Sequence, residues 1–198
     1  MQDYFTADLH LGHKAVAHHR GYTLAAHDNL IIDNLRKALN ERDRLFILGD
    51  LSVGEHGESH ALSLLGAVKQ ETGCEMHLIA GNHDSVHPMS SRAHRRHESF
   101  RLVFDSIASM GTLKLAGTRA LMHHMPYEGD HTKEDRFVEY RAPNHGMPII
   151  HGHTHSEVPV TWAAGDVPQI CVSLDAWRME PVTKEALTRI IDNPTGNN

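Results

Sequence analysis

The stretch HLIAGNHD, residues 77–84, joins a short apolar run directly to a cluster of polar side chains. Apolar runs of this length and composition are typical of buried strands. Where helices connect the strands of a sheet, site residues collect just past the carboxyl ends of those strands. The stretch therefore predicts a strand over 77–80 that delivers the polar residues 81–84 to one edge of a sheet.

The same pattern occurs four more times along the chain. In each case an apolar run is followed at once by residues of the types that bind metals. Strands that share one core would bring all five polar groups to the same edge. The four further runs, each with its polar continuation, are Tyr4–Ala7 with Asp8-Leu9-His10, Leu45–Leu48 with Gly49-Asp50, Ala120–Met122 with His123-His124, and Pro148–Ile150 with His151-Gly152-His153-Thr154-His155.

Helical periodicity separates the first three runs. Apolar residues recur at helical spacing within 30–39 and within 62–68. The resulting order of strand, helix, strand, helix, strand favours neighbouring parallel strands, and hence an α/β fold. Residues 183–192 predict a closing helix, with Thr183 as its N-cap.

A long polar stretch, residues 125–147, separates the fourth run from the fifth. Loops of this length in compact domains are usually functional or mobile. We expect a short helix inside it, around residues 134–140.

Composition limits the class of protein. A chain of 198 residues with 40% hydrophobic and 22% charged residues predicts a single globular domain over residues 1–198. The net charge of -6 argues against a stable complex with nucleic acid, which usually requires a basic excess. The sequence has no long apolar segment that predicts export or a membrane partner. Its two cysteines, Cys74 and Cys171, form no CxxC pair, so a cytoplasmic location is expected. The oligomeric state is not predicted.

The polar groups are two aspartates, an asparagine and several histidines, without a thiolate. Such sets suit Mn, Fe, Zn, Co or Ni better than a structural zinc site, which favours cysteine. They are too many for one tetrahedral ion, so we predict two divalent ions roughly 3.5–4 Å apart. Mn²⁺ is the expected ion, with Fe, Zn, Ni or Co as alternatives. Two ions need a bridging carboxylate, and we predict Asp50, which stands alone after its strand.

Each piece taken alone has a simpler interpretation. An Asp-x-His pair is common by chance, Gly-Asp after a strand is more often an ordinary turn, and His153-Thr154-His155 would fit a surface loop. Five such pieces in order, each directly after an apolar run, favour one site. A histidine-rich metal buffer would not need ligands at strand ends, and a (β/α)₈ barrel hydrolase needs about 250 residues.

Together these groups resemble the motifs of the calcineurin-like metallophosphoesterases, especially the small bacterial and phage members. The resemblance extends from residue 4 to about residue 185. The segment Val172–Trp177, followed by Pro181-Val182, looks like the closing strand of those small members. The motifs that carry the resemblance are Asp8-x-His10, Gly49-Asp50, Gly81-Asn82-His83-Asp84, His124-x-Pro126 and Gly152-His153-x-His155.

The resemblance implies a four-layer α/β/β/α sandwich with a dinuclear site at the carboxyl edge of its strands. His83 would not be a ligand; it would protonate the leaving oxygen, and Asp84 would orient it through a hydrogen bond. The implied ligands are Asp8, His10 and His155 for the first metal, Asn82, His124 and His153 for the second, and Asp50 between them.

Two features depart from this simple scheme. His123 and His124 are adjacent, and adjacent strand residues face opposite ways, so only one should reach the metals. The family's His-x-Pro pattern selects His124 and leaves His123 as a packing residue. Cys171 stands where similar chains often carry Asn, and we interpret it as packing.

The resemblance implies a phosphoesterase, and we expect a phosphodiesterase acting on a small phosphate ester, with a cyclic nucleotide, a nucleotide or a nucleic-acid end as substrates that the family allows. Two ions would lower the pKa of a bound water from 15.7 toward roughly 7, and the resulting hydroxide between them would attack phosphorus. The alternatives are a phosphomonoesterase, including a protein phosphatase, and a non-catalytic metal-binding scaffold. Arg136, Arg141 and His13 are the candidate substrate-binding residues, while Arg20 and the cluster Arg92–Arg96 are interpreted as solvated.

Overall fold

One parallel sheet holds the first three apolar runs. The computed structural model describes residues 1–193, and in it this sheet has the strand order β10-β1-β2-β3-β4. Strands β1 to β4 run parallel, as the alternation of strands and helices predicted, and β10 pairs antiparallel with β1. The bounds are β1 (Asp3–Thr6), β2 (Arg44–Ile47), β3 (Glu75–Ile79), β4 (Ser106–Ala108) and β10 (Val182–Thr183).

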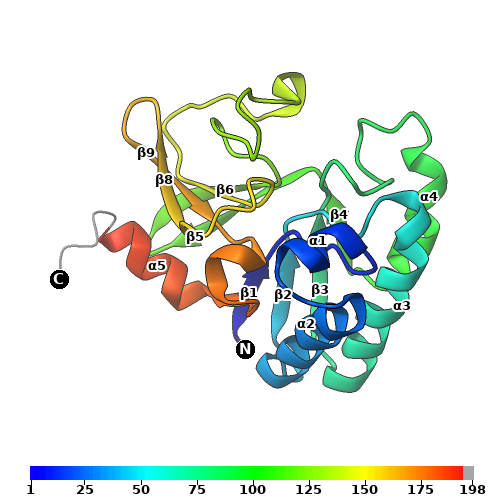
Figure 1. Ribbon diagram of the computed structural model, residues 1–198. Helices are drawn as coiled ribbons and strands as arrows, with labels where there is room; N and C mark the ends of the chain where they lie inside the picture. The colour runs from blue at the N-terminus through cyan, green and yellow to red at the C-terminus, as the bar shows by residue number, and fades with distance from the viewer. Residues whose placement is uncertain (194–198) are drawn as a thin grey trace.

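A second sheet holds the fourth and fifth runs. Its order is β5-β6-β7-β9-β8, with β6, β7 and β9 parallel and the two edge strands antiparallel to their neighbours. The two sheets lie against each other in Figure 1. The bounds are β5 (Met110–Leu115), β6 (Thr118–His123), β7 (Ile149–His151), β8 (Val160–Ala163) and β9 (Val167–Cys171).

The helices begin where the sequence offers capping residues. Thr23 Oγ1 accepts the Ala26 N–H at 3.3 Å at the start of α2, and Thr183 Oγ1 accepts the Ala186 N–H at 3.2 Å at the start of α5, as predicted. The bounds are α1 (Lys14–His19), α2 (Leu24–Ala38), α3 (Glu55–Thr72), α4 (Ala93–Arg101) and α5 (Lys184–Asp192), with 3₁₀ turns η1 (Val138–Tyr140) and η2 (Leu174–Trp177).

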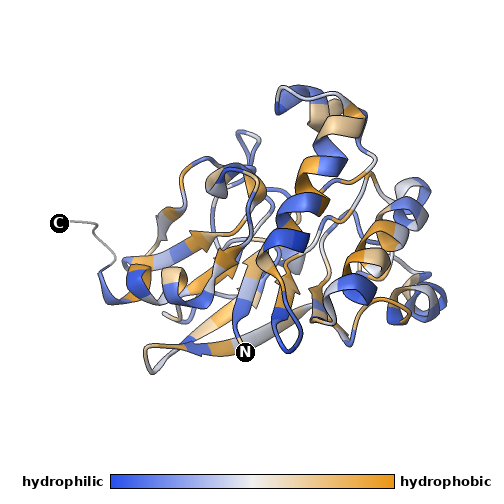
Figure 2. Cartoon of the chain, turned by 90° about the horizontal axis from the view of Figure 1, so that it is seen from below, coloured by the Kyte–Doolittle hydropathy of each residue, from blue (hydrophilic) through white to orange (hydrophobic). Residues whose placement is uncertain are grey.

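Two hydrophobic cores hold the layers together. One fills the space between the first sheet and helices α2 and α3, with Ile31, Leu35 and Leu65 packed against strand residues such as Leu45. The other lies between the two sheets and includes Phe5. In Figure 2 the central strands are largely orange, whereas the helices carry both colours, as expected when only one face of each helix is buried.

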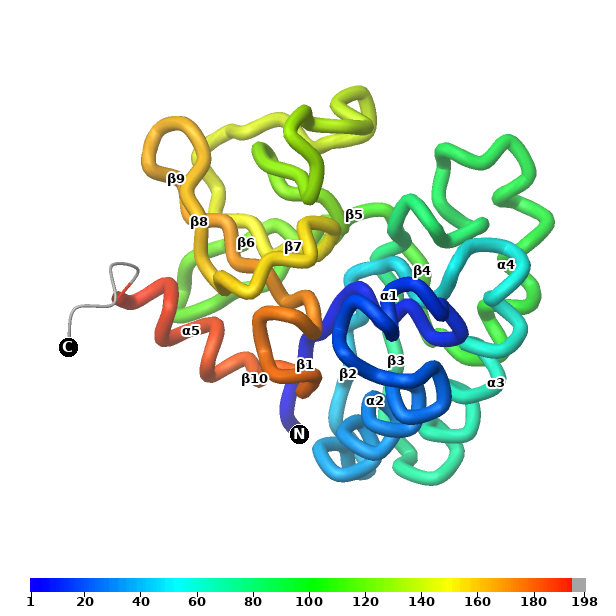
Figure 3. The backbone as a smooth tube through the Cα atoms, viewed as in Figure 1, coloured from blue at the N-terminus to red at the C-terminus, as the bar shows by residue number. Residues whose placement is uncertain are grey.

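The helical cover of the two sheets is unequal. Helix α5 packs where the sheets adjoin, and its Leu187 belongs to the core between them. The opposite face of the second sheet packs against the chain between β6 and β7, through Tyr127 and Ala142. This yellow-green segment rises beyond β6 and β7 in Figure 3. The predicted α/β fold with two sheets and helices is confirmed, although a loop covers the outer face of the second sheet.

Two local predictions were wrong. The expected helix around 134–140 is a single 3₁₀ turn over Val138–Tyr140. The segment Val172–Trp177 is not a full strand, because after one bridge between Ser173 and Ala7 the chain turns into η2. None of the helices in residues 1–193 combines the length and the apolar composition that a membrane span requires.

Candidate metal centre

The predicted ligands all lie in the segments that follow strands of the two sheets. The turns after β1 and β2 are joined by backbone hydrogen bonds from the Asp8 N–H to the Gly49 carbonyl and from the His10 N–H to the Asp50 carbonyl, both 3.0 Å. The turn after β7 is joined to the first sheet, because the His153 N–H contacts both Asp8 carboxylate oxygens, at 3.0 and 3.1 Å. The two sheets therefore meet at one edge, where the ligands converge.

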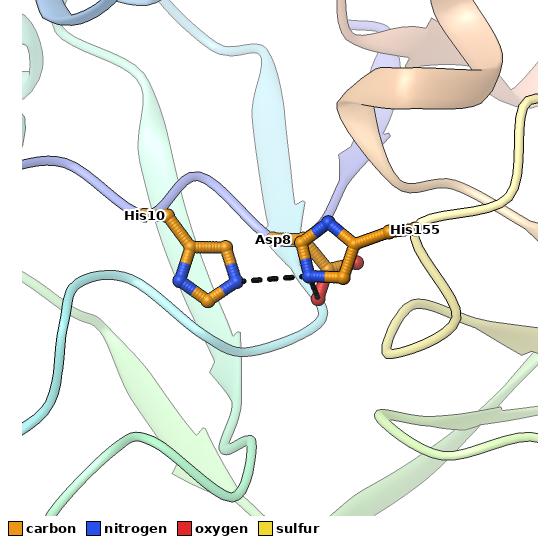
Figure 4. Close-up of side chains that lie close together, drawn as sticks. All are labelled: Asp8, His10 and His155. Atoms are coloured by element: carbon orange, nitrogen blue, oxygen red, sulfur yellow. Dashed lines mark hydrogen bonds and ion pairs between the residues drawn. The ribbon is translucent and has the colours of Figure 1, made fainter. Parts of the chain in front are cut away.

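Asp8, His10 and His155 form the first group. Their candidate ligand atoms lie within 4.8 Å of one another. Figure 4 shows the two rings facing each other with Asp8 beside His155. The two Nε2 atoms are 3.1 Å apart, and His155 Nε2 lies 3.9 Å from Asp8 Oδ1. This is the set that the family resemblance implied for the first metal.

Asn82, His124 and His153 form the second group. Asn82 Oδ1 lies 3.2 Å from His124 Nε2 and 2.9 Å from His153 Nδ1. Asp50 stands between the groups, with Oδ2 3.4 Å from His124 Nε2 and 3.9 Å from His10 Nε2. This position is the one that a bridging carboxylate needs, and the bridging role stays a prediction.

Backbone carbonyls determine which nitrogen two of the rings present. His10 Nδ1 lies 3.2 Å from the Ser52 carbonyl, and His124 Nδ1 lies 2.7 Å from the Leu48 carbonyl. A carbonyl only accepts, so each Nδ1 carries a hydrogen, and each Nε2 is the nitrogen that faces the site.

Carboxylates determine which nitrogen His155 and His153 present to the site. His155 Nδ1 lies 3.1 Å from Asp175 Oδ2, which leaves Nε2 for the site. His153 Nε2 lies 2.9 Å from Asp130 Oδ2, which leaves Nδ1 for the site. The two histidines of the His-Thr-His motif therefore use opposite nitrogens.

This donor set fits divalent cations. His10 Nε2 and His155 Nε2 lie 3.1 Å apart, so two nitrogen donors are within reach of one cation. Buried carboxylates of Asp8 and Asp50, 0% and 2% exposed, supply the negative charge, and no thiolate takes part. Imidazole and carboxylate sets of this kind suit Mn, Fe, Co, Ni or Zn.

The charges at the site favour a cation as well. Burial alone would lower the pKa of His124, but the neighbouring carboxylates, chiefly Asp50, raise it to about 10. Burial would raise the pKa of Asp50, and the charge and hydrogen bond of His124 outweigh it, so the pKa is lowered. Burial, with a contribution from His124, lowers the pKa of His153 to about 3. The Asp50 carboxylate is therefore ionised, between a charged His124 ring and a neutral His153 ring.

Five predicted ligands have backbone conformations that L-residues rarely adopt. The φ angles are 57° at Asp8, 46° at His10, 56° at Asp50, 68° at His153 and 49° at His155. Left-handed backbone costs a non-glycine residue roughly 1–2 kcal/mol. Such strain is typical of functional sites, where the surrounding structure holds it in place.

Two motif glycines are required by close packing. A Cβ on Gly81 would lie 2.3 Å from Asp50 Oδ1 and 2.9 Å from His124 Cε1. A Cβ on Gly152 would lie 2.6 Å from Asp8 Oδ2. No side chain larger than hydrogen fits at either position without displacing a ligand.

Comparison with known proteins identifies the family. A model of the calcineurin-like phosphoesterase superfamily domain matches residues 1–172. The chain belongs to the calcineurin-like phosphoesterase superfamily. The Gene 66 protein of Mycobacterium phage D29 is 36% identical to this phosphoesterase over 179 residues, covering 88% of each chain. That of phage L5 is 36% identical over 184 residues, covering 88% of this chain and 86% of its own.

A structural relative supports the fold. A protein of unknown function from Aquifex aeolicus superposes with a TM-score of 0.70, at 20% identity, covering 96% of this chain and 98% of that chain. The family resemblance seen in the motifs is confirmed, and membership supports a metal-dependent hydrolase of phosphoric esters.

His83 lies at the mouth of the phosphoesterase site. Its side chain is exposed, and its ring centroid is 5.5 Å from that of His10 at a steep interplanar angle of 75°. Its backbone N–H donates to Asp50 Oδ1 at 2.9 Å, which fixes the residue next to the predicted bridge. A ring that is held beside the ligands and open to solvent can reach a bound ester.

The predicted role of Asp84 needs correction. Across residues 1–193, no hydrogen bond joins its carboxylate to the His83 ring. The carboxylate instead accepts the backbone N–H groups of Gly81 at 2.8 Å and of Asp50 and Leu51 at 3.0 Å. Asp84 therefore fastens the turn after β3 to the turn after β2, and it is buried, with 2% exposure.

The three predicted substrate-binding residues differ in how close they lie to the site and in how exposed they are. The ring centroid of His13 lies 5.5 Å from that of His10, at the edge of the site. The side chain of Arg141 is only 4% exposed, and it donates to the Gly129 carbonyl and to Asp130, so its prediction as a substrate contact was wrong. The Arg136 side chain is 39% exposed and also pairs with Asp130, and its substrate role stays a prediction.

His124, not its neighbour, faces the ligands. His123 is buried with Nδ1 3.0 Å from both the N and O atoms of Met125, which is a packing position. The Cys171 thiol is also buried, 3.7 Å from Thr154 Oγ1, and burial raises its pKa to about 12. Both residues are structural, as the sequence favoured.

Sequence reasoning missed the residues behind the ligands. Asp175 and Asp130 hold His155 and His153. The segment of Asp175 was interpreted only as a closing strand, and Asp130 lies in the long polar stretch without a motif of its own. Arg20, which we interpreted as solvated, has a side chain only 4% exposed and is paired with Asp175. Because these partners are 155 residues apart, no local signal links them.

Proposed function

We propose that this protein is a two-metal phosphodiesterase. The observation that carries the proposal is the convergence of two nitrogen and oxygen donor groups on either side of the Asp50 carboxylate, at one edge of the two sheets. The intact site argues against a non-catalytic scaffold. The two free, buried cysteines are compatible with a reducing cytoplasm.

The chain itself holds the ions and handles one proton. Asp8, His10 and His155 would bind the first ion, Asn82, His124 and His153 would bind the second, and Asp50 would bridge. When bound, two divalent ions supply positive charge for the phosphate oxygens and activate a water molecule as nucleophile. The exposed ring of His83 then donates a proton to the leaving oxygen, which is typically worth about 10²–10⁴ in rate.

A phosphodiester keeps one of its two substituents after hydrolysis, and space for that substituent lies beside His155. A cavity of ≈ 240 Å³ opens there, lined among others by His19, Tyr22 and Arg178. Arg178 is exposed and forms no ion pair with any residue of the described chain, so its guanidinium is available to an anion or an oxygen-rich group. This lining favours a nucleotide-like ester over an apolar one.

The test is hydrolysis of bis-nitrophenyl phosphate and nitrophenyl phosphate, after chelation and after Mn²⁺ is added back. Asp50→Asn is the critical variant, because asparagine tolerates the left-handed backbone at this position. Asp43→Asn is its matched control, since Asp43 is a buried carboxylate at the other end of β2 that accepts the Gln2 N–H at 2.8 Å.

Metal-dependent cleavage of the diester that is lost in Asp50→Asn and kept in Asp43→Asn is the expected result. Faster cleavage of the monoester would instead assign a phosphomonoesterase. No cleavage of either compound with any of the five metals would overturn the proposal for these ester classes.

A further inference from the structure

Each histidine of the His-Thr-His motif is held from behind by a carboxylate of a distant segment. Asp175 in η2 contacts His155 Nδ1 at 3.1 Å, and Asp130 in the segment between β6 and β7 contacts His153 Nε2 at 2.9 Å. The Asp130 side chain is fully buried, and the Asp175 side chain is 11% exposed. A carboxylate behind a ligand ring fixes the ring's orientation and tautomer and makes the ring a stronger donor.

Arg20 holds the first of these carboxylates in place. Its Nε and Nη2 donate to the two oxygens of Asp175 at 2.8 and 2.7 Å. The same Nη2 donates to the Asp8 carbonyl at 2.9 Å. Arg20 thus connects the backbone of one ligand of the first group with the carboxylate that orients another, His155.

Two arginines hold the second carboxylate. Asp130 accepts from Arg136 Nη2 at 2.9 Å and from Arg141 Nη2 at 3.2 Å. Arg141 Nη1 also donates to the Gly129 carbonyl at 2.9 Å, which ties the pair to its own loop. The buried Asp130 carboxylate therefore attaches the loop between β6 and β7 to the His153 ring.

Each carboxylate forms a brace with the arginine that holds it, and the two braces contact different ligand groups. The brace of Asp175 and Arg20 touches Asp8 and His155, whereas the brace of Asp130 and Arg141 touches His153 only. We propose that these residues are positioning residues that set the affinities of the two metal positions separately. This inference rests on the proposed two-metal function.

In the experiment, the full chain is labelled with ¹⁵N-histidine and titrated with Zn²⁺. NMR monitors the signals of each histidine ring during the titration. The His153 and His155 signals are assigned with His153→Gln and His155→Gln. Without metal, the neutral form of His155 should carry its hydrogen on Nδ1 and that of His153 on Nε2. The tautomers report directly on the two contacts, and they do not depend on activity.

The critical variants are Asp175→Asn and Asp130→Asn. Asp175→Asn should alter the His155 signals and weaken Zn²⁺ binding at the first group about 10- to 100-fold, with little change at the second. Asp130→Asn should alter the His153 signals and weaken Zn²⁺ binding at the second group by a similar factor, with little change at the first. Asp3→Asn is the matched control, because Asp3 is a buried carboxylate held in the same bidentate way by Arg44, at 2.7 and 2.9 Å, away from the ligands.

Thermal unfolding in chelator checks that each variant is folded, and Arg20→Lys replaces Asp175→Asn if that variant is not. Arg20→Lys keeps the charge and loses the bidentate contact, so it should weaken the first group alone. Wild-type tautomers and affinities in the folded variants, or equal weakening at both groups, would overturn the proposal. Wild-type protein that binds Zn²⁺ at both groups and cleaves no ester would defeat the proposed function and leave this inference standing.

Discussion

His124 is the ring at which a proton and a metal ion compete. The neighbouring carboxylates, chiefly Asp50, raise its pKa to about 10 against the effect of burial, so the metal-free ring is charged at neutral pH. A histidine must be neutral to bind a metal, so binding releases that proton. The His155 pKa is raised too, since Asp175 and Asp8 outweigh burial, and His155 adds to the release.

Mn²⁺ binding should therefore release about one proton or more per chain at pH 7, and the apparent affinity should rise with pH up to the His124 pKa. Calorimetry in two buffers that differ in heat of ionisation measures the release. A binding heat that is the same in both buffers would contradict this assignment of the charge.

His83 offers a second prediction at the scale of one residue. His83→Ala should keep its metal content and lose about 10²–10⁴ in turnover on esters with a poor leaving group, and less on nitrophenyl esters, because a good leaving group needs no proton. His13→Ala is the control, since its ring lies at the same 5.5 Å from His10. Equal losses on good and poor leaving groups would exclude the acid role for His83.

At the scale of elements, the turn after β3 tolerates no added atom. Gly81→Ala would place a Cβ 2.3 Å from Asp50 Oδ1, so it should displace the ligand, lower the metal content and destabilise the fold by about 1–3 kcal/mol. Gly66→Ala is the comparison, because in the middle of α3 the new Cβ meets only Val103 Cγ2 at 3.6 Å. That variant should gain about 0.5–1 kcal/mol from helix propensity. Chemical unfolding and metal analysis measure both, and a Gly81→Ala protein with full metal content would show that the turn can move.

Strands that are buried on both faces were predictable from the sequence. Residues whose partners lie far away along the chain were not. The runs before Asp8, Asp50 and Asn82 are continuous and apolar because parallel strands are covered on both faces. Strand β5 was missed because its side chains alternate between exposed and partly buried and give no continuous apolar run, and α1 because six residues carry little periodicity. Arg141 and Asp84 were misassigned for a different reason: their partners are set by the tertiary fold.

On the scale of the whole molecule, the predicted metal centre spans the two sheets, which also share an apolar core and hydrogen bonds such as that from the His153 N–H to Asp8. Asp8, Asp50 and Asn82 follow strands of the first sheet, whereas His124, His153 and His155 follow strands of the second. Ions bound at this edge would cross-link the two layers, and we expect them to bind the folded chain in preference to the unfolded one.

Mn²⁺ at about 100 times its Kd should therefore stabilise the fold by about 2.7 kcal/mol, and raise Tm by about 5–10 °C for a chain of this size. Differential scanning calorimetry with metal and with chelator measures the shift. Asp50→Asn should reduce it and Asp43→Asn should not. An unchanged Tm in wild type would mean that the ions do not join the layers.

The left-handed backbone has consequences for the evolution of this fold and for protein design. It occurs at Asp8, His10, Asp50, His153 and His155. Glycine would relieve roughly 1–2 kcal/mol at each position, and a typical domain is stable by only about 5–15 kcal/mol. Selection for catalysis therefore works against selection for a durable fold at these positions. A lineage freed from hydrolysis would be expected to accumulate glycine there first, and a designer who wants only the scaffold would begin with the same five substitutions.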